Sequence, residues 1–269
     1  MSRLPGLDYS LNPYFGCEHG CIYCYSRSIF LNKELALKWG TFVKARTNMP
    51  DVLSKELANK REGVVGISTV TDPYQPLEAK LQITRRCLEA LSESHLTISI
   101  QTKSSLILRD LDLIKPTKFE VGITISTLDA SLASAIEPKA SPPDARAQVV
   151  EECSKRGVRT WVFLGPIIPE VNDTPEDITG IVKLAKKTGS YILYDKLNLR
   201  RWILEVLKPF FDGYKPGVHR KLKSLLHGGS DYWQGKAALI EDICAQNGVI
   251  CESAFPSTRS TYPFSNNRP

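Results

Sequence analysis

Three cysteines lie within eight residues of one another near the start of the chain. Cys17, Cys21 and Cys24 follow a C-x3-C-x2-C spacing in the stretch "GCEHGCIYC". Thiolates are soft metal ligands, and three of them leave one coordination position of a tetrahedral metal open. An open position favours chemistry over a structural metal site, which closes its coordination with a fourth residue.

Two alternatives remain open at this point. His19, between the first two cysteines, is a candidate fourth ligand for a closed zinc site, although such sites usually pair two separated Cys or His hooks. The three cysteines could also be unrelated core residues. Gly16 and Gly20 argue against this second alternative, because they indicate a tight, exposed loop.

The remaining four cysteines have a structural interpretation. The chain has seven cysteines with uneven spacing, so we expect reduced thiols rather than a complete disulfide framework. Cys87, Cys153 and Cys244 fall among apolar residues on helical faces and are predicted to pack in the core. Cys251 is also predicted to be structural.

Charge and hydropathy limit the class of protein. The chain has 35 Lys and Arg against 29 Asp and Glu, a net charge of +6, which permits an anionic partner without requiring one. Basic residues cluster in "LRRW" (199–202) and "HRKLK" (219–223). No run of 18 apolar residues and no secretory signal is seen, so we expect a soluble, cytoplasmic protein that does not enter a membrane.

The elements that must position these cysteines alternate in type. Short apolar runs alternate with amphipathic stretches, a pattern typical of βα units around a parallel sheet. The predicted strands span residues 9–12, 64–69, 96–102, 119–126, 159–167 and 191–199. Six such units predict an α/β fold with a partial (β/α)6 barrel of TIM type, not a closed eightfold barrel.

Helices are predicted between and after these strands. They span residues 81–94, 106–113, 144–156, 175–188, 201–211 and 231–247, with a further helix in the 29–59 region. We expect one domain over 1–269, with a core at about 10–200 and a helical C-terminal extension at about 201–269. A turn-rich tail, "FPSTRSTYPFSNNRP", ends the chain.

Tyr23, just before the last cysteine, completes a pattern that resembles the signature of the radical S-adenosylmethionine (SAM) superfamily. Further segments resemble its spore-photoproduct-lyase-like subgroup, often labelled DNA repair photolyases. These segments are "LNPYFGCEHGCIYCYSR", "STVTDPYQPLE", "QTKSSLILRDLDL", "ISTLD", "EPKASPPDAR" and "FLGPIIPEVND". The likeness spans about residues 10–200, which makes it far more specific than one short motif.

The resemblance implies two cofactors. Cys17, Cys21 and Cys24 would bind three irons of a [4Fe-4S] cluster, and the amino and carboxylate groups of SAM would chelate the fourth iron. A reducing partner such as ferredoxin or flavodoxin would supply an electron. Cleavage of SAM would then give methionine and a 5′-deoxyadenosyl radical that abstracts hydrogen from substrate.

The resemblance also implies residues that contact SAM. Lys103, at the end of the third strand, would neutralise the SAM carboxylate. The other candidates are Tyr23, Thr71 for the methionyl part, Thr124 and Ser126 for ribose or carboxylate, the main chain at Ile167 for adenine, and Asn198 for ribose. Glu137 and Arg146 would form a charge pair or bind SAM or substrate, and a surface salt bridge is the alternative.

One position departs from spore photoproduct lyase. That enzyme returns hydrogen from a cysteine just after its second strand, and Thr69 occupies the corresponding stretch here. A threonine O–H bond is too strong to donate hydrogen readily, so we do not expect repair of spore photoproduct. Tyr74 nearby could relay a radical, but a half-buried tyrosine at the barrel rim is the simpler interpretation.

Three functions therefore compete. The first is a radical SAM enzyme acting on a nucleic acid, which the subgroup and the basic stretches favour. The second is a radical SAM enzyme acting on a peptide, a protein or a small metabolite, because a barrel does not specify its substrate. The third is a non-enzymatic metal-binding protein.

Overall fold

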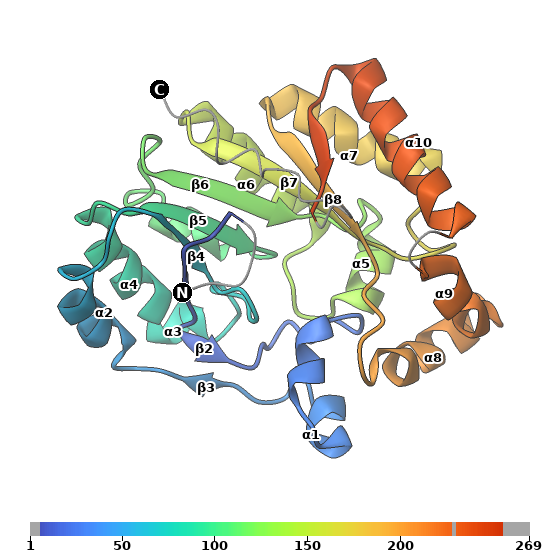
Figure 1. Cartoon of the computed structure of the whole chain (residues 1–269), viewed down its shortest axis with the longest axis horizontal. Coiled ribbons are helices and arrows are strands. Elements are labelled where there is room, and N and C mark those ends of the chain that lie inside the picture. Colours follow the sequence, from blue (N-terminus) through green and yellow to red (C-terminus); the bar gives the residue numbers. More distant parts are fainter. Residues whose placement is uncertain (1–5, 228–229, 255–269) are drawn as a thin grey trace.

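A seven-stranded parallel sheet forms the centre of the molecule (Figure 1). The computed structural model describes residues 6–227 and 230–254. The strands lie in chain order: β1 (Tyr9–Leu11), β4 (Val64–Ile67), β5 (Thr97–Thr102), β6 (Phe119–Thr124), β7 (Arg159–Ile167), β8 (Tyr191–Lys196) and β9 (Cys251–Ser253). Because β1 and β9 are the two edges, the barrel is open, as predicted.

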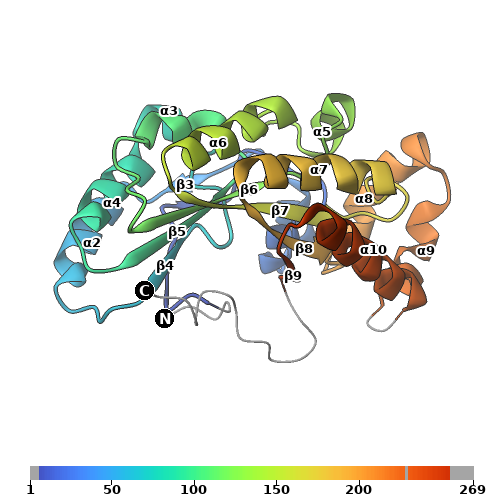
Figure 2. The ribbon, with the colours of Figure 1, turned by 90° about the horizontal axis from the view of Figure 1, so that it is seen from above.

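Helices cover the outer face of this sheet (Figure 2). They include α3 (Glu78–Leu81), α4 (Ile83–Ser92), α6 (Pro143–Lys155) and α7 (Pro175–Thr188). Alternate strand residues such as Ile98, Ile100, Val121 and Ile123 are fully buried against them. The period of two in each strand and the apolar stripe of each helix therefore build one core.

The core also contains the cysteines predicted to be structural. Cys87, Cys153 and Cys244 are buried in it, and Cys251 is half-buried against it. The core position predicted for Cys87, Cys153 and Cys244 is confirmed, and the structural role of Cys251 stays a prediction.

Several elements differ from the prediction. The seventh strand, β9, was not predicted, because three residues after a long helix carry too little periodicity to indicate a strand. Residues Ser105–Asp110 form a 3-10 helix, η2, in place of the predicted helix at 106–113. Short elements also escaped prediction: the antiparallel pair β2 (Tyr14–Phe15) and β3 (Lys44–Ala45), α5 (Ala130–Ile136) and α9 (Val218–Leu226).

The predicted helical region after residue 200 is present and adds to the barrel. It holds α8 (Ile203–Tyr214), α9 and α10 (Asp231–Asn247). The helix expected in the 29–59 region is two helices, α1 (Lys33–Leu37) and α2 (Met49–Leu57). The tail at 255–269 lies outside the described residues, and the one-domain interpretation stays a prediction.

The helices of the structure bear on the prediction that the chain does not enter a membrane. In residues 6–227 and 230–254, no helix has both the length and the apolar character needed to cross a bilayer.

Candidate active site

The three cysteines lie on a loop shaped by glycine. Residues 16–24, here called the Cys loop, join β2 to the 3-10 helix η1 (Tyr25–Ile29). Gly16 and Gly20 have φ of +90° and +66°, which disfavour other residues. A Cβ on Gly40 would lie 2.7 Å from the Gly20 Cα. The two backbones are therefore in direct contact, and this contact fixes the position of the Cys loop.

The segment after β4 holds this loop by hydrogen bonds. The Glu18 N–H donates to Gln75 Oε1 over 2.8 Å, and Glu18 Oε2 accepts from the Leu77 N–H over 2.5 Å. The Thr71 hydroxyl, predicted to contact SAM, donates to the Gly16 carbonyl over 2.5 Å. Thr71 therefore positions the Cys loop, and its role toward SAM stays a prediction.

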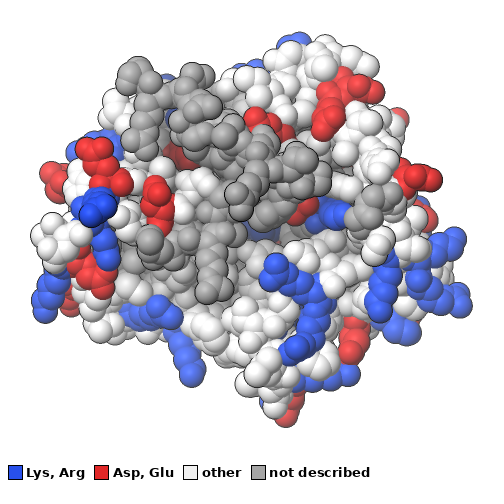
Figure 3. Space-filling view, viewed as in Figure 1, with Lys and Arg blue, Asp and Glu red and all other residues white. Residues whose placement is uncertain are grey.

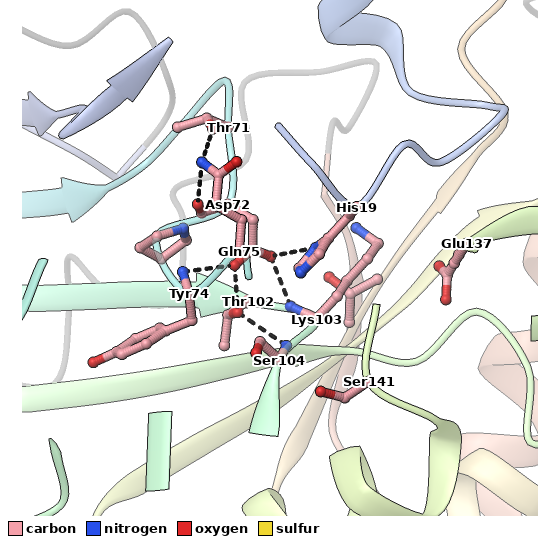
Figure 4. Close-up of polar contacts among 12 residues, drawn as sticks. His19, Thr71, Asp72, Tyr74, Gln75, Thr102, Lys103, Ser104, Glu137 and Ser141 are labelled. Carbon is pink, nitrogen blue, oxygen red and sulfur yellow. Dashed lines mark hydrogen bonds and ion pairs between the residues drawn. The ribbon is translucent and has the colours of Figure 1, made fainter. Parts of the chain in front are cut away.

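Asp72 connects the Cys loop to the end of β5 (Figure 4). Its Oδ1 accepts from the Thr102 hydroxyl over 2.7 Å, and its Oδ2 accepts from the Lys103 N–H over 2.9 Å. Oδ2 also lies 3.4 Å from Nδ1 of His19. Burial would raise the Asp72 pKa, but His19, Thr102 and the Lys103 amide outweigh it and lower the pKa to about 2.

The thiols are buried and close enough to influence one another. Cys17 and Cys21 are 7% and 5% exposed, and Cys24 is half-buried. Burial first, and then Asp72, Cys21 and Cys24, raise the pKa of Cys17. Burial also raises the pKa of Cys21, to about 12, although Lys103 opposes this rise. A bound metal would remove this cost, because coordinated thiols lose their protons.

The arrangement of the thiols differs from a closed site for one ion. Within the part of the chain that the structure describes, no three Cys, His, Asp or Glu side chains are grouped to hold a metal ion. His19 faces Asp72 and lines a pocket of about 410 Å³ with Ser104 and Ser141. His19 is therefore held toward Asp72 in this structure, and the zinc alternative stays untested.

Lys103 lies over the Cys loop. Its Nζ is 5.8 Å from the centre of the Tyr23 ring, and the side chain is half-buried. Burial would lower the Lys103 pKa, but Cys21, Glu137, Asp72 and Cys24 raise it overall. In residues 6–227 and 230–254, the ammonium has no carboxylate within ion-pair distance. A cation in such a place suits a small carboxylate ligand.

Glu137 is the second polar centre of the site. Its Oε1 accepts from the Ser126 hydroxyl over 2.9 Å and from the Tyr23 hydroxyl. Its carboxylate pairs with the guanidinium of Arg146, which also donates to the Thr124 carbonyl over 3.1 Å. Both members of the pair are buried, so a surface salt bridge, the alternative raised from the sequence, is wrong.

These contacts occupy some of the predicted SAM-binding groups. Tyr23 and Ser126 are bound to Glu137, and the Thr124 hydroxyl accepts from Gln101 over 3.2 Å. The Ile167 carbonyl accepts from the Leu197 N–H over 3.0 Å. Asn198 is exposed, two residues beyond the end of β8. The role of each of these five residues toward SAM stays a prediction.

Two residues at the carboxyl ends of strands have buried polar atoms that no described residue satisfies. Asn12 follows β1 and Ser68 follows β4, and the Ser68 N–H donates to the Leu11 carbonyl over 2.7 Å. Asn12 Oδ1 and Ser68 Oγ are buried and have no hydrogen-bond partner among the described residues. Ser68 has φ of +62°, a strained value for a residue with a Cβ. Ser68 begins the stretch 68–72 that the resemblance places at the methionyl part of SAM, whereas no local pattern indicated Asn12.

Tyr74 also differs from its prediction. It is fully buried in the main core, so the interpretation as a half-buried tyrosine at the rim is wrong. Asp72 folds this turn inward, because its Oδ1 also accepts from the Tyr74 N–H over 2.9 Å.

Residues 11–185 match the family model described as the radical SAM superfamily. The chain belongs to this superfamily. Among curated relatives, an uncharacterized protein of Methanocaldococcus jannaschii is 33% identical over 202 residues, or 74% of each chain. The predicted superfamily is therefore confirmed, and radical SAM proteins use a [4Fe-4S] cluster and SAM.

Solved structures share the fold. Spore photoproduct lyase complexed with dinucleoside spore photoproduct aligns with a TM-score of 0.71 and 12% identity, over 94% of this chain and 78% of that chain. A variant of that lyase with bound AdoMet and dinucleoside spore photoproduct aligns with a TM-score of 0.70 and 12% identity, over 93% and 77%. At this identity the likeness supports the partial barrel alone, and it confirms the predicted fold class.

The residues present fit the cofactors of the superfamily. Three free thiols on one loop provide soft ligands, and the Lys103 ammonium lies beside them without a carboxylate partner in the described part of the chain. Assignment of Cys17, Cys21 and Cys24 as the iron ligands is a proposal that rests on this donor set.

Proposed function

We propose that this protein cleaves SAM reductively and directs the resulting radical at a hydrogen atom of a nucleic acid. The observation that carries the proposal is the Cys loop at the carboxyl ends of the strands, with three thiols beside the Lys103 ammonium, which has no carboxylate partner among the described residues. Active sites of parallel barrels form at these ends. When bound, the reduced cluster supplies the electron that splits SAM into methionine and a 5′-deoxyadenosyl radical.

The chain's own residues have distinct tasks in this proposal. Cys17, Cys21 and Cys24 hold the cluster, and Lys103 binds the carboxylate of SAM. Asp72 fixes the end of β5 against the Cys loop, so that Lys103 and the thiols keep one relative position. The aromatic and apolar wall around Cys21 and Tyr23 keeps water out of the site.

The nucleic-acid substrate has separate support. The structural neighbour with a TM-score of 0.71 is complexed with dinucleoside spore photoproduct. A relative from Pseudomonas phage M6 is named a radical SAM Nalpha-GlyT isomerase, which supports radical SAM chemistry and does not by its name specify the substrate class. That relative is 24% identical over 182 residues, which are 66% of this chain but 37% of the relative. Spore photoproduct itself is not proposed, because the resemblance places Thr69 in the stretch where that lyase has its hydrogen-donating cysteine. A ferredoxin or flavodoxin donor and a cytoplasmic location stay predictions.

The experiment compares Cys21→Ala with Cys153→Ala after anaerobic reconstitution with iron and sulfide. Wild type and Cys153→Ala should absorb at roughly 400 nm and form 5′-deoxyadenosine from SAM on reduction. Cys21→Ala should lose both signals and keep its circular dichroism spectrum. Cys153 is the matched control because it is buried in α6 and packs in the main core.

The outcomes separate the competing functions. Retention of the cluster and of SAM cleavage in Cys21→Ala would contradict the ligand assignment. A wild-type protein that binds metal but neither binds nor cleaves SAM would support the non-enzymatic alternative. Deuterium transfer from a labelled oligonucleotide into 5′-deoxyadenosine would support the nucleic-acid substrate. Transfer only from a peptide or a metabolite would overturn it.

A further inference from the structure

The positive charge of this chain is concentrated in one short segment. Residues 200–227 contain seven Lys and Arg against two Asp and Glu, a balance of +5, and the whole chain has +6. The segment contains α8 and α9. Because α8 contacts η1, which directly follows Cys24, this charge lies near the Cys loop.

The two helices turn their apolar sides inward. The buried residues recur at every fourth position: Ile203, Leu207 and Phe211 in α8, and Val218, Leu222 and Leu226 in α9. They pack in a second hydrophobic cluster that includes Cys21 and Tyr23. Residues four apart share one face of a helix, so the remaining positions of α9 face outward.

Exposed cations lie at the outward positions of α9 and just before α8. Arg200, Arg201, Arg220, Lys221 and Lys223, here called the basic face, are exposed. None of them forms an ion pair in the part of the chain that the structure describes, whereas Lys208 pairs with Asp212 over 2.6 Å. Figure 3 shows that Lys and Arg side chains outnumber acidic ones over α8 and α9, at the lower right. Such a surface attracts a polyanion.

An aromatic residue connects the basic face to the Cys loop. The Arg200 guanidinium lies 5.5 Å from the centre of the Tyr25 ring, and Tyr25 directly follows Cys24. Its side chain is 39% exposed, and its hydroxyl donates to the Thr69 carbonyl over 3.0 Å. Exposed aromatic rings beside arginine stack on nucleobases without sequence preference.

We propose that the basic face binds the phosphodiester backbone of a nucleic acid and leads the strand past Tyr25 to the Cys loop. A membrane surface would also attract these cations, but a helix that lies in the membrane interface inserts an apolar face as well. The apolar faces of α8 and α9 are already packed in the second cluster, so a nucleic acid suits the surface better. The inference rests on the proposed function for the substrate, but binding itself requires no SAM.

The test uses two triple variants of the full chain with equal charge. One is Arg220→Glu, Lys221→Glu and Lys223→Glu, which changes the basic face. The matched control is Lys55→Glu, Arg61→Glu and Arg86→Glu, which changes three exposed residues on and near α2 and α4. Affinity for a fluorescent single-stranded DNA, its duplex and an RNA of the same sequence is measured by anisotropy at several salt concentrations.

We expect the variant of the basic face to bind about tenfold or more weakly, with a salt slope lower by about 2 for a single strand, since three phosphate contacts are lost. The control should change much less. Equal weakening of both variants, or no salt-dependent binding by wild type, would overturn the proposal. Binding to vesicles of anionic lipid but not to any nucleic acid would overturn it too.

A second readout separates this inference from the proposed function. Formation of 5′-deoxyadenosine without substrate should be the same in wild type and both triple variants, because none of the six residues lies in the Cys loop. Absence of SAM cleavage in wild type would refute the proposed function while leaving the DNA-binding result intact.

Discussion

Lys103 is a site residue whose positive charge has no ion-pair partner among the described residues. A half-buried ammonium without a carboxylate partner in the described part of the chain loses hydration, and nearby groups such as Cys21 and Glu137 compensate for this loss without forming an ion pair with it. Glu137 lies near enough to raise its pKa, but the Glu137 carboxylate is already paired with Arg146. The cation is therefore available for a ligand that enters beside the Cys loop.

Lys103→Ala should weaken SAM binding about tenfold or more. A charge-assisted hydrogen bond contributes about 1.5–3 kcal/mol, and about 1.4 kcal/mol corresponds to tenfold in affinity. Equilibrium dialysis of SAM against reconstituted protein measures the change. Lys55→Ala, at an exposed position in α2, is the control. An unchanged affinity in Lys103→Ala would remove this residue from the site.

Alternation along strand β6 determines which of its side chains face the core and which face the inside of the barrel. Its outward residues, such as Val121 and Ile123, fill the core, and alternation turns Glu120 and Gly122 to the inner face. A Cβ on Gly122 would lie 2.2 Å from the Trp161 ring, so the ring covers this strand. Glu120 is 5% exposed, and its Oε1 has no hydrogen-bond partner among the described residues.

Glu120 should make stability depend on pH. Burial raises its pKa to about 7, although Ser99 and Arg159 oppose the rise. The folded protein then keeps this proton up to about pH 7, whereas the unfolded chain loses it near pH 4.3, so the free energy of unfolding falls as pH rises between these values. By pH 8, the free energy of unfolding should have fallen less in Glu120→Gln than in wild type, by up to about 3 kcal/mol.

Urea unfolding at pH 5 and pH 8 measures this difference. Glu152→Gln provides the control, because Glu152 lies on the outer surface of α6 in an ion pair with Lys155. If the Glu120→Gln variant lost stability with pH as steeply as wild type, the assigned pKa would be wrong.

At the scale of the whole molecule, the C-terminal helices pack against the barrel. Helix α10 packs on α7, and β9 pairs with β8 at the edge of the sheet. Helices α8 and α9 pack on the Cys loop through the second hydrophobic cluster. The site residues and the extension therefore stabilise one another.

A chain ending at Leu199 should not fold cooperatively. The truncation exposes the edge of β8, one side of α7 and the apolar wall around Cys21. We expect the full chain to unfold in one thermal transition and the fragment to show no near-UV circular dichroism signal. A fragment that melts cooperatively would instead indicate a barrel domain independent of the extension.

The sequence by itself determined the features that neighbouring residues encode. The thiol spacing occupies eight residues. Each predicted strand or long helix shows its hydrophobic periodicity within one short window of sequence. The superfamily, the partial barrel and most element positions were therefore predictable. The short β9 was not, because its pairing depends on β8 rather than on its own pattern.

Only the tertiary structure decided which polar groups meet. Thr71 bonds to Gly16 across 55 residues of sequence, and Tyr23 bonds to Glu137 across 114. Such pairs form because the parallel strands bring their carboxyl ends to one rim, and no local periodicity specifies which side chains face one another there. The physical reason is that a buried polar group must find its partner in space, at whatever distance along the chain that partner lies.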